Sequence, residues 1–277
     1  MSAAVSSPTP GTQRPRTVGR VTQAHVARSE WTKLRSLRST RWAMLVTVLL
    51  TTGIGILAAT VFAARWPQLS PGDKLRFHPL RVSLAGVGLA QLSIGVLGVL
   101  VISAEYSTGM IRASFTAVPK RLPVLWAKAI VFAAVTFALM LPAVLIAFFA
   151  SQSILSRHHV NLHFSDPHVA RAVIGAALYL TVIAIFSLGL GAIIRNTAGG
   201  IAAFAAILFV IPPLMNVLPS SWNDAASPYL PGNAGRAILA VRPDSSSLAP
   251  WTGFGVFCAY AAGALVVAAI LLVRRDT

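Results

Sequence analysis

The chain has 277 residues, of which 56% are hydrophobic and 11% are charged, and its net charge is +16. Soluble domains usually carry about 25% charged residues, so this composition excludes an ordinary water-soluble protein. A chain this basic also suits nucleic-acid binding. Here, however, the Lys and Arg residues lie between long apolar runs, where they act as membrane-orientation signals. We therefore expect an all-α polytopic membrane protein that binds no nucleic acid.

The N-terminal part predicts a tail followed by a helix. Residues 1–19 are rich in Ser, Pro, Thr and Ala, which is typical of a disordered segment, here a cytoplasmic tail. In the stretch "VTQAHVARSEWTKLRSLRSTRW", Glu30 and Lys33 lie off the face formed by apolar residues at helical spacing, namely Val21, Ala24, Ala27, Trp31 and Leu34. This pattern favours an interfacial helix in the headgroup region. The alternative is a basic flank that only fixes membrane topology.

Six apolar runs follow, each close to the roughly 20 residues that a helix needs to cross a bilayer. They are 43–64, 83–104, 124–150, 172–194, 199–217 and 252–273. The one charged side chain within them is Lys128, near the start of the third run, where we expect it to reach back to the interface. Pro142 predicts a kink in that run, and Pro212-Pro213 leave the end of the fifth run uncertain.

Basic residues predict the orientation of these spans. Of the 23 Lys and Arg residues, 15 fall on the side of the bilayer that holds both termini and the link between spans two and three. We therefore expect both termini in the cytoplasm of a bacterial plasma membrane. The single cysteine, Cys258, excludes an intrachain disulfide.

The stretch "AEYSTGMIR" stands at the cytoplasmic end of the second span. It contains Glu105, one of only two glutamates in the chain, and we expect this carboxylate to leave the membrane into water. Ser107, Thr108 and Gly109 permit a sharp turn. The apolar and basic residues that follow predict a short amphipathic element that docks on a cytoplasmic partner. An ordinary polar loop is the alternative.

The longer stretch "EYSTGMIRASFTAVPKRLPVLWAKAIV" resembles the signature of ABC-2-type transporter permeases, in particular the small six-span subunits of bacterial antibiotic exporters. The residues that match the order of this signature are Glu105, Tyr106, Gly109, Arg112, Arg121 and Lys128. Met110 departs from it, because Thr is more usual there. "SEWTKLRSLRSTRW" resembles the cytoplasmic elbow helix of the family, "IIRNTAGGIA" its turn between spans four and five, and "SPYLPGNAGRAIL" its segment before the last span.

This resemblance implies an ABC-2-type transmembrane domain over residues 20–277, acting as the permease subunit of an ATP-driven exporter. The segment that contacts a separate ATPase subunit would include Glu105, Tyr106, Ser107, Thr108, Gly109, Arg112 and Arg121. Glu105 would pair with a basic group of that subunit or hold the elbow helix through Arg35 or Arg38. The elbow helix would comprise Trp31, Lys33, Leu34, Arg35 and Arg38.

The resemblance further implies a second permease copy or a sister permease as partner, in contact with membrane lipid. The chain lacks the G-x-x-x-x-G-K-[ST] motif, so it cannot hydrolyse ATP by the P-loop route, and we expect no catalytic site or cofactor of its own. ATP and Mg²⁺ would bind to the ATPase subunit. The uncharged spans favour an apolar or amphipathic cargo such as an antibiotic, a peptide or a lipid.

Few polar side chains lie within the spans. Those that could line a pathway, or equally hydrogen bond one helix to another, include Gln91, Ser93, Thr136, Tyr179 and Asn216. The histidine-rich loop "RHHVNLHFSDPH" lacks the regular spacing of a metal site, so we expect a solvated loop and no metal. Two other functions stay open: a secondary transporter driven by an ion gradient, and a membrane scaffold without transport activity.

Overall fold

The computed structural model describes residues 23–36, 38–107, 121–217, 219–242 and 247–274. Within these ranges all regular structure is helical, and six helical segments are long and apolar enough to cross a membrane. This confirms the all-α polytopic fold. The six segments are Arg38–Gln68, Pro79–Tyr106, Leu122–His158, Val169–Ile194, Thr197–Met215 and Pro250–Arg274. Each overlaps its predicted span, and most boundaries move outward because helical turns continue past the apolar run.

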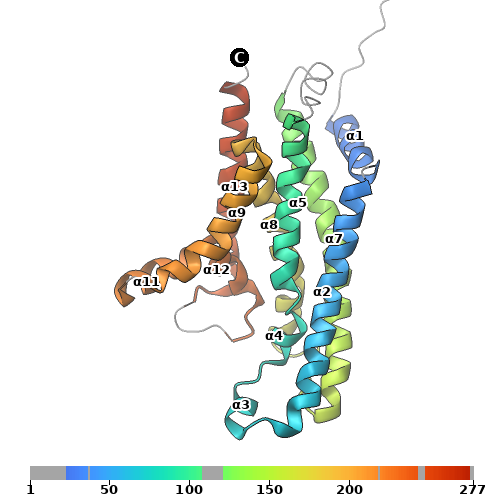
Figure 1. The fold of residues 1–277 in the computed structure, drawn as a ribbon, viewed down its shortest axis with the longest axis vertical. Helices are drawn as coiled ribbons and strands as arrows, with labels where there is room; N and C mark the ends of the chain where they lie inside the picture. Colours follow the sequence, from blue (N-terminus) through green and yellow to red (C-terminus); the bar gives the residue numbers. More distant parts are fainter. Residues whose placement is uncertain (1–22, 37, 108–120, 218, 243–246, 275–277) are drawn as a thin grey trace, which may run out of the picture.

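The N-terminal half is built from long helices joined by short ones. Figure 1 shows α1 beside the end of the bundle from which α2 descends. The elements of this half are α1 (Gln23–Ser36), α2 (Arg38–Arg65), η1 (Trp66–Gln68), α3 (Pro71–Leu75), α4 (Pro79–Ser83), α5 (Val87–Ser107) and α7 (Arg121–Leu155). α7 continues as one helix through Pro142, and residues 108–120 between α5 and α7 lie outside the described residues.

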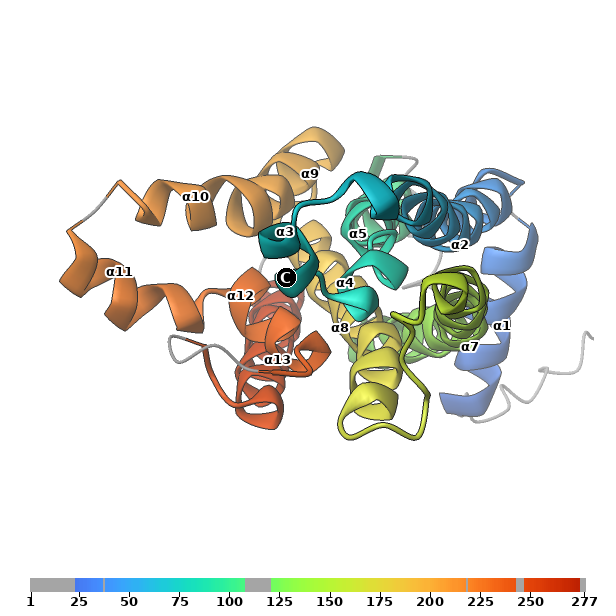
Figure 2. The ribbon, with the colours of Figure 1, turned by 90° about the horizontal axis from the view of Figure 1, so that it is seen from below.

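The C-terminal half contains the most buried span and the least buried one. Its elements are η2 (Ser156–His158), α8 (Val169–Ile194), α9 (Thr197–Ala205), η3 (Ala206–Val210), α10 (Ile211–Met215), α11 (Ser220–Ala226), η4 (Ser227–Tyr229), α12 (Pro231–Arg236), η5 (Ala237–Leu239) and α13 (Pro250–Arg274). α8 packs against α5, α7 and α13 and is 67% buried, whereas the segment from α9 to α10 is 17% buried. α9 packs against α5 and α8, and Figure 2 shows α10 and α11 extending away from the other helices.

Glycines at α5 and α8 allow the central helices to approach closely. A Cβ on Gly98 would lie 2.1 Å from the Ser187 Oγ, and one on Gly191 would lie 2.8 Å from the Ile102 Cγ2. Small residues serve this purpose in membrane helices, where close van der Waals packing replaces the hydrophobic effect as the force that joins helices.

The fifth span changes geometry ahead of its two prolines. η3 is a π-helical turn, and α10 follows it with Pro212 and Pro213 in its first turn. Because proline has no N–H, the two prolines cannot donate to carbonyls one turn earlier, and irregular turns in membrane helices commonly accompany such a loss. The sequence leaves this boundary uncertain, and the structure places the end of the helix at Met215.

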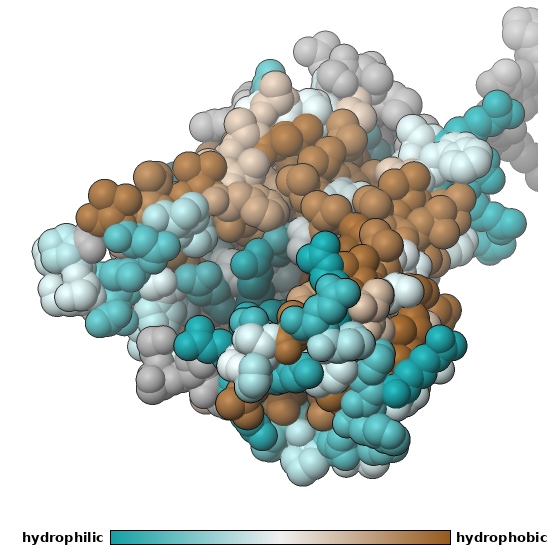
Figure 3. Space-filling view, turned by 60° about the horizontal axis from the view of Figure 1, so that its bottom comes forward, coloured by the Kyte–Doolittle hydropathy of each residue, from teal (hydrophilic) through white to brown (hydrophobic). Residues whose placement is uncertain are grey.

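Large apolar side chains cover much of the outer surface. Figure 3 shows wide hydrophobic areas on the bundle and on the part of the chain that extends from it. Among the exposed residues are Leu49 and Leu57 of α2, Val210, and Leu214 of α10. Exposed apolar area of this extent is expected for a surface that faces lipid or another membrane subunit. The chain is therefore a multi-pass membrane protein.

Candidate functional site

Four charged side chains meet where α1 lies against the ends of α5 and α7. Lys128 Nζ donates hydrogen bonds to Glu30 Oε2 at 2.6 Å and to Glu105 Oε1 at 2.9 Å. Lys33 Nζ donates to Glu30 Oε1 at 2.7 Å and to Glu105 Oε1 at 3.2 Å. We call these four residues the charge cluster. It uses both glutamates of the chain and two of its four lysines, so its formal charges cancel.

Helical spacing on α1 brings Glu30 into this cluster. Val26, Glu30 and Leu34 recur every four residues and are buried, so they share the face that packs on the protein. Val26 packs with Val124 and Ala127 of α7. Lys33 lies one turn beyond Glu30 and forms an i,i+3 ion pair with it. α1 is thereby fixed to α7 by apolar contacts and to both α5 and α7 by ion pairs.

One sequence-based expectation about Glu105 is wrong, and another is met by a different residue of α1. Glu105 is 6% exposed and does not extend into water, because two ammonium groups bind its carboxylate inside the protein. Lys128 is 4% exposed, and its ammonium is bound inside the protein by the carboxylates of Glu30 and Glu105; its expected position at the membrane interface stays a prediction. Glu105 holds α1 through Lys33, whereas Arg35 and Arg38 are exposed to solvent.

The face of α1 that packs on the bundle is not the apolar face predicted from the sequence. Leu34 is buried, Trp31 is 49% exposed, and Glu30, which the sequence places off the apolar face, is buried on the face that contacts α7. Hydrophobicity alone assigned Glu30 to the outside. Two cations offset the cost of burying its carboxylate, so the charged residue can take an inner position.

The ion pairs shift the pKa values of the two α1 residues. Burial raises the pKa of Glu30, but the ammonium groups of Lys128 and Lys33 together lower it by more than burial raises it. The net pKa therefore lies below its ordinary value. Burial lowers the pKa of Lys33, but the carboxylates of Glu30 and Glu105 outweigh this effect, so the net pKa lies above its ordinary value. All of these attractions hold the charged forms in place.

These directions predict how stability depends on pH. Since the pKa of Glu30 is lowered on folding, its contribution is present above its ordinary value of about 4.3 and is lost as the pH falls through the folded-state pKa. Lys33 contributes below about 10.4 and loses its contribution as the pH rises through its raised pKa. We expect the difference in melting temperature between wild type and Glu30→Gln to be constant from about pH 6 to 8 and to shrink below about pH 4. A difference that is constant down to pH 3 would contradict this assignment.

The last turn of α5 is held on its other side by the turn between α8 and α9. The Arg195 guanidinium lies 5.0 Å from the centroid of the Tyr106 ring and donates to the Leu271 carbonyl of α13 at 3.3 Å. Thr197 Oγ1 donates to Ser103 Oγ at 2.8 Å. Arg195 caps α8 with a left-handed φ of 58°, which turns the chain into α9. The end of α5 therefore connects the charge cluster to α8, α9 and α13.

The other residues of this chain that are predicted to contact the ATPase subunit lie within residues 108–120 or directly beside them. Ser107 is the last residue of α5, and Arg121 is the first residue of α7. Thr108, Gly109 and Arg112 lie outside the described residues. The predicted amphipathic element there stays a prediction, and the structure gives the two helix ends that flank it.

The candidate pathway residues mostly form hydrogen bonds within the chain. Tyr179 Oη donates to Gln91 Oε1 at 2.6 Å, and the hydroxyls of Ser93 and Thr47 are 2.5 Å apart. Thr136 Oγ1 donates to the Phe132 carbonyl of its own helix at 2.8 Å. Asn216 is exposed after α10 and accepts a 3.4 Å hydrogen bond from Asn223. These contacts favour hydrogen bonding between and within helices, while the pathway role stays a prediction.

Substitution of Tyr179 separates these two roles. Tyr179→Phe leaves the buried Gln91 amide without its donor, which costs about 1–3 kcal/mol. If Tyr179 holds helices together, we expect a lower melting temperature. Tyr260→Phe is the control, because Tyr260 is 43% exposed on α13 and the same hydroxyl is removed. Unchanged stability combined with altered transport would instead support a pathway role.

Sequence reasoning missed the pairing of Lys33 and Lys128 with the two glutamates, and it missed the contacts of Arg195. The signal that could have found this pairing is that the chain has only two glutamates, one before the first span and one at the end of the second.

Among the described residues, no group of three or more His, Cys, Asp and Glu side chains is placed to hold a metal ion. Neither the comparison with protein-family models nor that with curated proteins finds a match for this chain.

Proposed function

We propose that this chain is the membrane-spanning permease subunit of an ATP-binding cassette exporter of the ABC-2 type. The observation that carries the proposal is the charge cluster, which joins α1 to the two helices flanking residues 108–120. By resemblance to ABC-2-type permeases, the link formed by residues 108–120 would contact the ATPase subunit, and α1 would be the elbow helix. Buried ion pairs at both ends of such a link would transmit its displacement to the spans.

The packing suggests how displacement would spread. Glu105 lies at the end of α5 and Lys128 lies two turns into α7, so movement of the link acts on both helices at once. α5 and α7 pack on α8, the most buried span. Closure of two ATPase subunits would tilt these helices together and open the path on the other side, which is alternating access between two states. ATP and Mg²⁺ would bind to the ATPase subunit and not to this chain.

The uneven burial of the spans supports a second permease subunit, either another copy or a sister chain. Burial is 22% for the segment that contains α2 and 17% for the segment from α9 to α10, against 56% for the segment that contains α5. The complex would lie in a bacterial plasma membrane with both termini in the cytoplasm, because the basic residues concentrate on that side. The cargo would be apolar or amphipathic.

The location of the charges also weighs against an ion-gradient transporter. Secondary transporters place their coupling-ion sites near the middle of the bilayer. Here the buried carboxylates and lysines gather at one end of the spans and neutralise each other. A scaffold without transport activity stays as the other alternative, and it would have no reason to stimulate an ATPase.

The test is purification of the tagged chain from native membranes in mild detergent, followed by an ATPase assay. We expect an ATP-binding subunit to copurify, with activity that depends on the complex. Glu105→Gln should insert normally and lower the coupled ATPase activity about tenfold, since it removes a charge from a buried pair. Asp224→Asn is the matched control, because Asp224 is an exposed acid on α11.

The outcomes separate the class of protein from the role of Glu105. Recovery of intact protein with no ATPase would overturn the exporter proposal and favour the two alternatives. Recovery of an active complex that Glu105→Gln leaves unaffected would keep the class and refute coupling through Glu105.

A further inference from the structure

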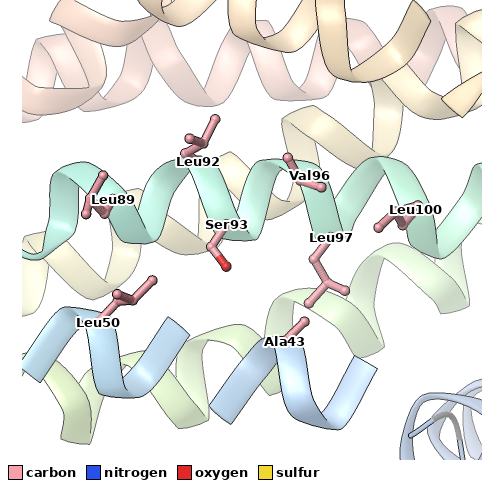
Figure 4. Close-up of a pocket in the computed structure, with 8 residues that line it drawn as sticks. All are labelled: Ala43, Leu50, Leu89, Leu92, Ser93, Val96, Leu97 and Leu100. Atoms are coloured by element: carbon pink, nitrogen blue, oxygen red, sulfur yellow. The ribbon is translucent and has the colours of Figure 1, made fainter. Parts of the chain in front are cut away.

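An apolar groove lies between α2 and α5 on the outside of the bundle. Its volume is about 300 Å³, and Ser93 is the one polar residue of its lining, which consists of Ala43, Leu50, Leu89, Leu92, Ser93, Val96, Leu97 and Leu100. Figure 4 shows Ala43 opposite Leu97, with Leu50 nearer Leu89. The Ser93 hydroxyl is already bonded to Thr47. The groove therefore presents a hydrocarbon surface to whatever fills it.

The extent of the groove matches one leaflet of a bilayer. From Leu89 to Leu100, α5 rises about 16 Å at 1.5 Å per residue, and half of a hydrocarbon core is about 15 Å. Ala43 lies in the second turn of α2, so the groove begins near the α1 end of the bundle. It covers the hydrocarbon region of the leaflet at that end.

Uncompensated positive charge lies at the same end. Four arginines on α1 and on the first turn of α2 are exposed, namely Arg28, Arg35, Arg38 and Arg41. The one acidic residue of α1, Glu30, is already paired with Lys33 and Lys128. Between Arg38 and the groove residue Ala43 stands Trp42, which is 65% exposed, and tryptophan favours the headgroup level of a membrane. Among the described residues no ion pair neutralises these four arginines, so an anion at this level meets a basic surface.

We propose that this region is a binding site for an anionic phospholipid. One acyl chain occupies the groove between α2 and α5, and the phosphate lies among Arg38, Arg41 and the indole of Trp42. The charge of the arginines selects an anionic headgroup over a zwitterionic one, and the groove selects a lipid over a soluble anion. The site requires only that α2 and α5 span a membrane, so it does not depend on the exporter proposal.

The first test measures lipid selectivity. The purified chain is titrated with phosphatidylglycerol or phosphatidylcholine of identical acyl chains, and bound lipid is counted by native mass spectrometry. Each basic residue near an anionic surface contributes about fivefold in affinity, so we expect a preference of at least about tenfold for phosphatidylglycerol. Arg38→Gln combined with Arg41→Gln should abolish it. Arg76→Gln combined with Arg81→Gln is the matched control, because these exposed arginines lie at the other end of the bundle and should leave it intact.

The second test fills the groove. Val96→Phe should lower binding of both lipids about tenfold, whereas Val61→Phe, on an exposed part of α2 outside the groove, should not change it. Circular dichroism and melting temperature check that each variant is folded. Equal binding of the two lipids by wild type, or a preference that survives loss of Arg38 and Arg41, would overturn the proposal.

A second copy of the chain is the competing occupant. Val96→Cys, made with Cys258→Ser so that it is the only thiol, reports this outcome. High-yield disulfide formation between two copies in membranes would show that protein fills the groove, which would also overturn the lipid site. Exclusively monomeric chains together with lipid selectivity would support it.

Discussion

Lys128→Met is expected to destabilise the protein by about 3–5 kcal/mol, the range for breaking a buried ion pair. The substitution keeps the length of the side chain but removes the ammonium that donates to Glu30 at 2.6 Å and to Glu105 at 2.9 Å. Both carboxylates are buried, and Lys33, with a side chain that is 37% exposed, is then their one remaining cation in the cluster. Two like charges thus share one partner in a poorly solvated site.

The free energy of unfolding from a denaturant titration in detergent measures this loss. Lys74→Met is the control, because Lys74 lies at the other end of the bundle and contacts the Trp66 ring at 5.6 Å; we expect a change below about 1 kcal/mol. Combining Lys128→Met with Glu30→Gln and Glu105→Gln should recover part of the loss, since the unpaired charges disappear. Equal effects of Lys128→Met and Lys74→Met would show that the cluster does not hold α1 in place.

Gly86→Ala is expected to cost about 1–3 kcal/mol or more through overpacking between α2 and the turn that leads into α5. A Cβ at this position would lie 2.2 Å from the Thr51 carbonyl oxygen and 2.7 Å from the Thr51 Cα. These are backbone atoms of α2, so no side chain can rotate away, and the two helices must separate. The hydrogen bond between the hydroxyls of Thr47 on α2 and Ser93 on α5 would weaken as a result, because Ser93 lies two turns beyond Gly86.

Gly88→Ala provides a matched control two residues away. A Cβ on Gly88 would meet nothing within 4 Å, and alanine is the better residue within a helix by roughly 0.5–1 kcal/mol. The melting temperature should therefore fall for Gly86→Ala and stay the same or rise for Gly88→Ala. A fall of similar size in both variants would mean that the close approach at Thr51 is not what makes Gly86 necessary.

The charge cluster and the Arg195 contacts together make the end of α5 a junction. Glu105 faces α1 and α7, and Tyr106, the next residue, contacts Arg195 beyond the last turn of α8. If the proposed coupling is correct, variants at Glu105 should mainly lower the ATPase activity that depends on the link between α5 and α7. Variants at Arg195 should disturb how α5 moves against α8 and α13.

The sequence by itself determined the six spans. A helix that crosses a bilayer must satisfy its own backbone hydrogen bonds and expose apolar side chains over about 20 residues. Both requirements are local, so they can be recognised in runs such as 172–194, which the structure extends by three residues, to Val169. The end of the fifth span was uncertain because Pro212-Pro213 permit several local geometries.

Only the tertiary structure decided what the charges do. Glu30 and Lys128 are 98 residues apart, and Glu105 and Lys128 are 23 apart, so no local pattern pairs them. On hydrophobicity alone, Glu30 lies off the apolar face of α1, yet the structure buries it against α7 while Trp31 is 49% exposed. The reason is that a carboxylate is costly to bury alone but not beside two ammonium groups, and those groups come together only when α1, α5 and α7 have packed.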